Sequence, residues 1–155
     1  MPSQPIHFTL NDVLFTCMVP PHWTLHEVLR DAGALPDVPD ACTDGDCCRC
    51  TVLLNGHAVC ACHILAPEAA GHAVYTRSGL ADHPVVDELE NLVSSCGSCI
   101  DAYALVAIDH VQAARRGDVP RLGDGLLSMP CTCHIEPQVR RVVQRLVRGR
   151  SQPAS

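Results

Sequence analysis

The chain has 155 residues, of which 47% are hydrophobic and 18% are charged, and its formal net charge is −6. Its eleven basic residues are all arginines, and no basic stripe precedes the C-terminus, so the composition disfavours a nucleic-acid partner. No stretch reaches the roughly 20 apolar residues of a membrane span, and the first residues lack the pattern of a signal peptide. We therefore expect no membrane insertion and a reducing, cytoplasmic location for the many cysteines.

The beginning of the chain predicts a β-hairpin followed by a helix. Apolar and polar residues alternate over 6–10, and a second extended run covers 13–19, with an Asn-Asp turn between them. Thr24 and Glu27 have the spacing of a capping box, which predicts that a helix begins there. Gly33 ends this helix.

A second hairpin is expected further along. Residues 51–54 and 57–59 flank Asn55-Gly56, a strong signal for a two-residue hairpin turn. Residues 73–76 can add one more strand. Two hairpins with a helix between them predict a β-grasp, plant-type ferredoxin-like domain over residues 1–79.

After residue 79 the periodicity changes from strands to helices. Asp82 can cap a helix whose apolar residues recur at helical spacing over 85–93. The run 100–111 is apolar nearly all round, which indicates a buried helix, and 139–147 carries a clear apolar stripe opposite several arginines. The sequence thus predicts an α+β chain with an all-helical second domain over 80–155.

Eight of the eleven cysteines form two sets of four. The first set has the spacing C-x4-C-x2-C-x11-C, whose beginning is typical of plant-type ferredoxins, and the second has the spacing C-x2-C-x31-C-x1-C. Four thiolates hold one [2Fe–2S] cluster, so the sequence predicts two clusters and a role in electron transfer. The first set is Cys42, Cys47, Cys50 and Cys62, and the second is Cys96, Cys99, Cys131 and Cys133.

The surroundings of both sets suit an anionic cluster. Gly45 permits a close approach and a positive φ in the first loop. Cys96 and Cys99 begin one predicted helix, and Cys131 and Cys133 precede another. Two helix N-termini would then face the second cluster, where their dipoles favour negative charge.

Other uses of these thiols stay open. Cys-x2-Cys pairs also bind structural zinc, although the remaining spacings are not those of zinc fingers or ribbons. Cys48 could replace Cys47 as a ligand, and Cys60 could replace Cys62, although the spacing favours Cys47 and Cys62. Cys17 lies in a predicted strand and is expected to be a small buried apolar residue.

The motifs resemble those of a known family. CTDGDCCRCTVLLNG is similar to the pattern C-G-x-G-x-C-G-x-C-T-V-L-x-D-G, and VYTRSGLADHP is similar to the segment that follows the first domain. The four later cysteines match the C-G-x-C and C-x-C pairs of the same proteins. Over residues 5–147 the chain resembles the small iron–sulfur subunit of the molybdenum hydroxylases, the family of xanthine dehydrogenase, aldehyde oxidoreductase and carbon monoxide dehydrogenase.

This resemblance implies a function in a larger complex. It implies one [2Fe–2S] cluster in the β-grasp domain and one in a four-helix-bundle domain. Electrons would pass from molybdopterin in a large catalytic subunit to the helical-domain cluster, and then to the ferredoxin-type cluster. They would leave to FAD in a flavin subunit or to the haem of a cytochrome. The subunit itself would contain no catalytic residue.

The chain departs from the family pattern at several positions. Thr43 and Cys48 stand where the family has glycine, Ser95 stands in place of glutamine, and Ile100-Asp101-Ala102 replaces T-P-G. Thr132 and the residues after Cys133 also differ. These departures motivate two alternatives: a divergent complex with an unusual cofactor or acceptor, or a non-enzymatic redox sensor that uses the spare thiols of Cys48 and Cys60.

Overall fold

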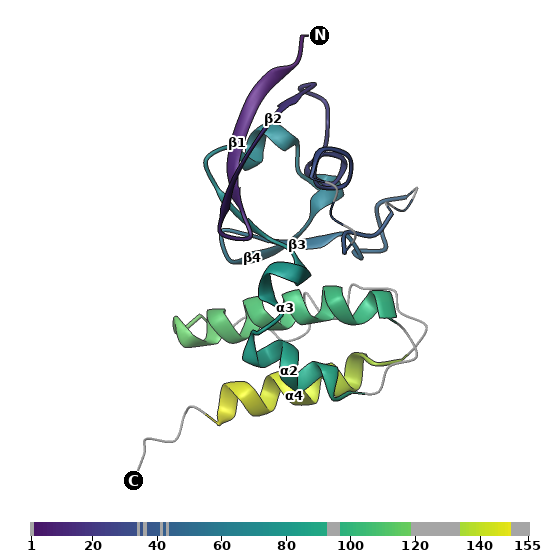
Figure 1. Cartoon of the computed structure of the whole chain (residues 1–155). Coiled ribbons are helices and arrows are strands. Elements are labelled where there is room, and N and C mark those ends of the chain that lie inside the picture. The colour runs from purple at the N-terminus through teal and green to yellow at the C-terminus, as the bar shows by residue number, and fades with distance from the viewer. Residues whose placement is uncertain are drawn as a thin grey trace.

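The structure is a computed structural model that combines a β-sheet with a group of helices, and it has the α+β character expected from the sequence (Figure 1). The sheet lies in the upper part of the view and the helices α2, α3 and α4 lie below it. The structure describes residues 2–33, 35, 37–40, 42, 44–92, 97–118 and 134–149.

Five strands form one sheet in the order β2-β1-β5-β3-β4. Strand β1 pairs with β2 antiparallel and with β5 parallel, while β3 pairs antiparallel with both β4 and β5. The last strand in the sequence therefore inserts between the two hairpins, and both predicted hairpins are confirmed. The strands are β1 (Gln4–Leu10), β2 (Val13–Val19), β3 (Thr51–Leu54), β4 (His57–Cys60) and β5 (Ala73–Tyr75).

Both hairpins close through turns with positive φ. Asn11 and Asp12 have φ values of 49° and 69°, and Asn55 and Gly56 have φ values of 51° and 83°. Two successive residues with positive φ are the mark of a type I′ turn, whose twist matches that of paired strands. Asparagine, aspartate and glycine tolerate this conformation best, which explains why the sequence predicts the two turns correctly.

The helix predicted at Thr24 is present, but its second half is wider than an α-helix. In the capping box the Thr24 N–H donates to Glu27 Oε2 over 2.6 Å, and the Glu27 N–H donates to Thr24 Oγ1 over 3.3 Å. Helix α1 (Leu25–Glu27) continues directly as the π-helical turn η1 (Val28–Ala32). The Gly33 N–H donates to the Val28 carbonyl over 2.8 Å and ends it, as predicted.

Short 3₁₀ turns connect the strands and lead to the helices. Turn η2 (Ala61–His63) follows β4 directly, η3 (Ala66–Ala69) lies between η2 and β5, and η4 (Arg77–Leu80) leads from the sheet to the helices.

The helical part contains α2 (Pro84–Glu90), α3 (Gly97–Arg115) and α4 (Glu136–Arg148). The predicted cap at Asp82 is wrong, because His83 is the N-cap and its Nδ1 accepts the Val85 N–H over 3.2 Å. Pro84 occupies the first helical position, which it favours because it has no N–H to satisfy, and this fixes the cap one residue before it. Within the described residues, three helices of the expected four-helix bundle are present.

Two groups of buried side chains form the core. One fills the space between the sheet and α1–η1, and the other is built mainly by α2, α3 and α4. Leu53 of β3 belongs to the helical group, and the Ala58 N–H of β4 donates to Asp109 Oδ2 of α3 over 2.9 Å. Helix α3 therefore packs directly against the β3–β4 hairpin. Through this contact, α3, whose first turn contains Cys99, is joined to the hairpin that follows the first cysteine loop.

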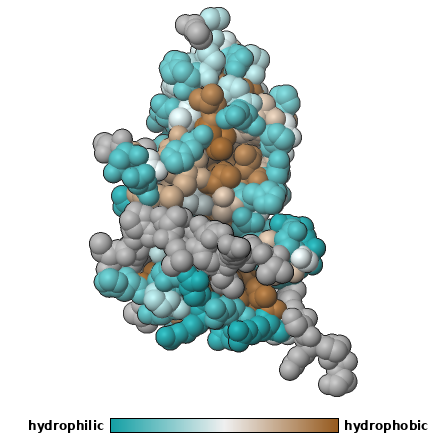
Figure 2. All heavy atoms as spheres, turned by 180° about the vertical axis from the view of Figure 1, so that it is seen from behind, coloured by the Kyte–Doolittle hydropathy of each residue, from teal (hydrophilic) through white to brown (hydrophobic). Residues whose placement is uncertain are grey.

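The surface differs between the two parts. Figure 2 shows apolar residues gathered on the upper, sheet-bearing part, whereas hydrophilic residues cover most of the visible helical part. The exposed apolar side chains include Val13, Leu14 and Met18 of the edge strand β2, which are 68%, 71% and 60% exposed. None of the helices in the described part of the chain is long and apolar enough to cross a membrane.

Candidate iron–sulfur site

Helix α1 and turn η1 hold the segment that leads into the first cysteine loop. The Nε2 atom of the buried His26 lies 2.7 Å from the Pro39 carbonyl oxygen. Arg30, one turn later, donates to the Val38 carbonyl over 3.3 Å and forms an ion pair with Asp40 over 2.6 Å. These contacts hold residues 38–40, which lead toward Cys42.

The loop itself contains two residues in the left-handed region. Gly45 has a φ of +75°, and a Cβ atom at this position would lie 2.9 Å from Nε2 of His63. Glycine is therefore required both by the backbone and by the close approach of the His63 ring, as the sequence predicts. Cys48 has a φ of +53° although it has a side chain, and it stands where the resembling family has glycine.

The end of the loop is tied to β3 and to η2. The Thr51 N–H and the Thr51 hydroxyl both donate to the Cys48 carbonyl, over 3.2 Å and 2.5 Å. The Ala61 N–H donates to the Cys50 carbonyl over 3.2 Å. This second bond brings the segment from Cys60 to Cys62 against the loop, so thiols from two parts of the sequence meet.

The thiols at this junction interact strongly with one another. Burial opposes ionisation of Cys47, but hydrogen bonds from the Arg49 backbone N–H and from the Cys42 thiol outweigh it, and the pKa of Cys47 lies below its ordinary value. The pKa of Cys50 is lowered to about 5, mainly by a hydrogen bond from the Cys60 thiol. Burial opposes this shift, and further hydrogen bonds from Cys62 add to it. Cys50 is thus stabilised as a thiolate, the form that binds iron.

Two thiols compete for the place of fourth ligand. The pKa of Cys62 is raised to about 12, first by burial and then by its hydrogen bond with Cys50. The charges of Cys50, Cys42 and Cys47 raise it further. The pKa of Cys60 is also raised, first by its hydrogen bond with Cys50, then by burial and by Cys48. Both thiols therefore interact with Cys50. The charges of Cys42 and Cys47 also act on Cys62, and Cys48 also acts on Cys60.

The described thiols of the first set are compatible with a cluster. Within the described residues, no three His, Cys, Asp or Glu side chains form a group that could hold one metal ion. A [2Fe–2S] cluster takes four thiolates in total across two irons. Four interacting thiols around a loop that needs glycine at residue 45 are compatible with that larger group. The described cysteines, Cys17 included, are free thiols.

Of the second ligand set only Cys99 can be placed. It lies in the first turn of α3, is partly buried, and packs against the helical core. Cys96, Cys131 and Cys133 lie outside the described residues, as do Ser95 and Thr132. Figure 1 shows that α3 and α4 begin at the same end of the helical part, which agrees with the expectation that two helix N-termini share one site.

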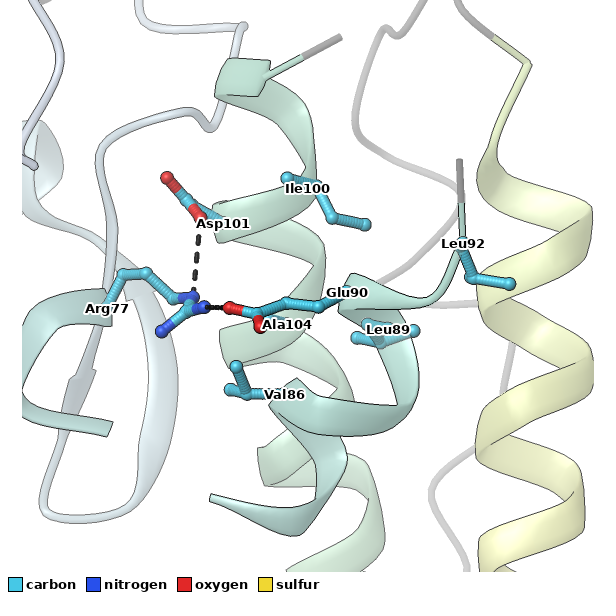
Figure 3. A pocket seen from close by; sticks show the side chains of 8 residues that line it. All are labelled: Arg77, Val86, Leu89, Glu90, Leu92, Ile100, Asp101 and Ala104. Atoms are coloured by element: carbon cyan, nitrogen blue, oxygen red, sulfur yellow. Dashed lines mark hydrogen bonds and ion pairs between the residues drawn. The ribbon is translucent and has the colours of Figure 1, made fainter. Parts of the chain in front are cut away.

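A pocket of about 350 Å³ lies beside this end of α3, between α2 and α3. Figure 3 shows Arg77 reaching toward both Glu90 and Asp101 at its polar edge, while Val86, Leu89 and Ile100 are among its apolar lining residues. Arg77 lies 2.5 Å from Glu90 and 3.3 Å from Asp101. Burial raises the pKa of Asp101 and Arg77 partly offsets the rise.

Sequence reasoning missed three residues that shape the site. His26 and Arg30 hold the segment before Cys42, and their i, i+4 spacing on a predicted helix could have placed them on one face. Arg49 lies beside Cys47. Its place inside the cysteine motif was visible, but its contacts depend on the tertiary structure.

The fold and the thiols together define a class of protein. A five-stranded sheet whose loop and neighbouring turn bring six cysteines together agrees with the ferredoxin-like iron–sulfur protein expected from the sequence. No protein-family model matches the chain.

Curated relatives narrow this class. The chain is 29% identical over 107 residues to the nicotinate dehydrogenase small FeS subunit of Eubacterium barkeri, covering 66% of this chain and 68% of that protein. It is 27% identical over 135 residues to the xanthine dehydrogenase iron–sulfur-binding subunit of Escherichia coli O157:H7, covering 83% and 84%. It is 28% identical over 144 residues to the gamma subunit of caffeine dehydrogenase from Pseudomonas sp. strain CBB1, covering 86% and 84%.

Solved structures share the fold. Quinoline 2-oxidoreductase from Pseudomonas putida 86 matches with a TM-score of 0.73 at 22% identity, over 96% of this chain and 99% of that chain. Aldehyde oxidoreductase from Desulfovibrio gigas matches with a TM-score of 0.77 at 22% identity, over 97% of this chain and 18% of that chain. By sequence the chain is similar, at 29% and 27% identity, to small iron–sulfur subunits of nicotinate and xanthine dehydrogenases, which agrees with the resemblance to the molybdenum hydroxylase family.

Proposed function

We propose that this chain is the electron-transfer subunit of a multi-subunit oxidoreductase and carries two [2Fe–2S] clusters. The observation that carries the proposal is the junction at which Cys42, Cys47, Cys50 and Cys62 interact with one another. When bound, a cluster of this kind accepts and gives up one electron at a time. The protein contributes four thiolates, a loop shaped by Gly45, and the burial of Cys50, which is 2% exposed.

The outer ligand set is proposed as Cys42, Cys47, Cys50 and Cys62. Its support is the spacing C-x4-C-x2-C-x11-C, together with the bond from the Ala61 N–H to the Cys50 carbonyl, which brings the segment 60–62 against the loop. Cys62→Ser and Cys60→Ser form a matched pair that separates the candidates. We expect Cys62→Ser to lose about half of the iron and one electron paramagnetic resonance signal, and Cys60→Ser to keep both. The opposite pattern would assign Cys60 as the ligand.

The inner ligand set is proposed as Cys96, Cys99, Cys131 and Cys133. The position of Cys99 at the start of α3 supports it, together with the common starting end of α3 and α4. We also propose a β-grasp domain over 1–79 and a four-helix domain over 80–155, supported by the two separate groups of core residues. Iron and sulfide analysis of anaerobically purified protein tests the cluster number, and zinc or a single cluster per chain would contradict it.

The partners are proposed from the relatives. Their names describe subunits of nicotinate and xanthine dehydrogenases, which supports a large catalytic subunit with molybdopterin for this chain too. A flavin subunit with FAD, or a cytochrome with haem, would accept the electrons from the outer cluster. The exposed apolar residues of the edge strand β2 support a protein contact, because natural sheets usually protect such edges.

Copurification from the native host tests the partners. We expect a molybdopterin-containing subunit and a flavin or haem protein to accompany the chain. The relatives do not favour the unusual-cofactor complex or the redox sensor. We also propose a cytoplasmic location, as expected from the sequence for a chain with many cysteines.

A further inference from the structure

Strand β2 is an open edge of the sheet. It stands at the end of the strand order, and β1 is its only strand neighbour. Leu14 and Met18 are 71% and 60% exposed, and Thr16 between them is exposed as well. These three residues alternate along the strand, so their side chains lie on the face opposite to Phe15 and Val19, which pack toward the core.

The backbone groups of the same three residues also lack a partner. On β1, the His7 carbonyl and the Thr9 N–H form bonds of 2.8 Å and 2.9 Å on the side of β5. Polar groups of successive residues point to opposite sides of a strand, so the β1 residues between these two bond β2. Their partners on β2 are Val13, Phe15, Cys17 and Val19. Leu14, Thr16 and Met18 therefore direct their N–H and C=O groups away from β1, and in the described part of the chain no turn or loop bonds them.

The strand has none of the features that usually protect the edge of a sheet. Residues 13–19, VLFTCMV, contain no charged residue and no proline, and their register with β1 continues without a bulge. Segments of this length with high β-propensity and no charge pair readily with another strand. The edge is therefore suited to a further strand rather than to solvent.

The sequence of β2 is complementary to itself in the antiparallel direction. In the register centred on Thr16, Leu14 lies opposite Met18 of a second copy, and Thr16 lies opposite its own equivalent. Residues directly opposite each other then exchange both backbone bonds, so every group that is free in the single chain finds a partner. Asp12, the acidic residue nearest to the strand in the sequence, lies opposite Pro20 in this register, so no like charges meet.

We propose that β2 is an interface between two copies of this chain, joined edge to edge into one continuous ten-stranded sheet, five strands from each copy. This inference goes beyond the proposed function and does not depend on the clusters. It gives the exposed edge an occupant whose side chains and backbone groups match those of β2. An oxidoreductase complex built on this contact contains two copies of the subunit.

Sedimentation equilibrium of the full chain, purified anaerobically with a reductant, measures the association. The apparent mass should rise from 16.7 kDa toward twice that value as the concentration increases. Thr16→Pro removes the central N–H of the interface from both copies but none from the ladder with β1, so the variant should keep its fold. The loss of two backbone bonds should weaken the dimer about 10–100-fold. Thr16→Val keeps the N–H and is the matched control, which should associate like the wild type.

A second pair of variants tests the register. In Leu14→Lys/Met18→Lys the introduced ammonium groups face each other across the interface, so the dimer should be lost. In Leu14→Lys/Met18→Glu each introduced ammonium group faces a carboxylate of the other copy, so the dimer should persist although the strand has gained the same number of charges. Circular dichroism confirms that both variants are folded.

Amide hydrogen exchange gives an independent measurement. The N–H groups of Leu14, Thr16 and Met18 should become protected on dimerisation, while those of Phe15 and Cys17, which are already bonded to β1, should not change. Equal association of the two charged variants, or a chain that stays monomeric at every concentration, overturns the proposal. Edge amides that become protected only when a different subunit is bound also overturn it, because they assign the edge to that subunit. Iron analysis tests the two-cluster function separately, so the failure of one proposal is distinguishable from the failure of the other.

Discussion

Gly45→Ala is the most direct test of how the first cysteine loop is built. At this position φ is +75°, and the added methyl group would lie 2.9 Å from Nε2 of His63, so the ring has to shift. Gly71 provides a matched control, because its φ is +76° and nothing lies within 4 Å of a methyl group added there. The two variants share the backbone cost and differ in the contact with His63.

The structure gives the expected size of each effect. A left-handed residue with a Cβ costs about 1–2 kcal/mol, and the lower entropy of the unfolded alanine chain returns about 0.4–1 kcal/mol. Gly71→Ala should therefore cost about 1 kcal/mol. Overpacking typically adds about 1–3 kcal/mol, and because the imidazole can rotate the lower end applies, so Gly45→Ala should cost about 2 kcal/mol.

Thermal unfolding of the intact protein at a fixed scan rate measures the difference. For a chain of this length about 1 kcal/mol corresponds to about 2–4 °C, so we expect midpoints lower by about 3 °C for Gly71→Ala and about 6 °C for Gly45→Ala. In a His63→Ala background the cost of Gly45→Ala should fall to that of Gly71→Ala, because the contact is gone.

The outcome can refute the reasoning in two ways. Equal midpoints for Gly45→Ala and Gly71→Ala would show that His63 does not restrict the loop. An excess cost that survives in the His63→Ala background would show that something other than the imidazole meets the added methyl group.

Two further variants test the strain and the ion pairs near the site. Cys48→Gly should be about 1 kcal/mol more stable than Cys48→Ala, because only alanine keeps a Cβ at a φ of +53°; a thermal midpoint equal to or below that of Cys48→Ala would argue against strain there. Arg77→Ala should lower stability by about 1–3 kcal/mol at pH 7.5, because it leaves Asp101 and Glu90 without their cation. At pH 5 this loss should be smaller. Burial raises the pKa of Asp101, and removing Arg77 raises it further, so Asp101 is protonated more readily in the variant. A protonated Asp101 carries no negative charge that needs a cation. A loss that is the same at both pH values, measured by thermal unfolding, would mean that Arg77 acts through packing alone.

The parts of the fold that sequence reasoning predicted are those decided by local chemistry. The Asn55-Gly56 turn requires positive φ at both residues, and the capping box of Thr24 and Glu27 satisfies N–H groups within one turn. Such features need no knowledge of distant residues. The cap of α2 was misplaced at Asp82 because two candidate residues precede Pro84, and only the position of the proline decides between them.

The parts that were missed depend on residues far apart in the chain. The bond between His26 and the Pro39 carbonyl spans thirteen positions, and a sequence pattern shows the helix face of His26 but not its acceptor. The choice between Cys60 and Cys62 likewise depends on how η2 folds back onto Cys50. Spacing favours Cys62, and the choice stays a prediction because both thiols lie in the segment that the Ala61 N–H bond to the Cys50 carbonyl brings to the loop.

The departures from the family pattern that can be placed are not scattered. Cys48 replaces a glycine and accepts a left-handed backbone, and its side chain packs against the helical core, which a glycine could not do. Asp101, in the altered segment after Cys99, pairs with Arg77 of the turn that joins sheet and helices. The side chain of Cys48 thus connects the first cysteine loop to the helical core, and Asp101 connects α3 to η4.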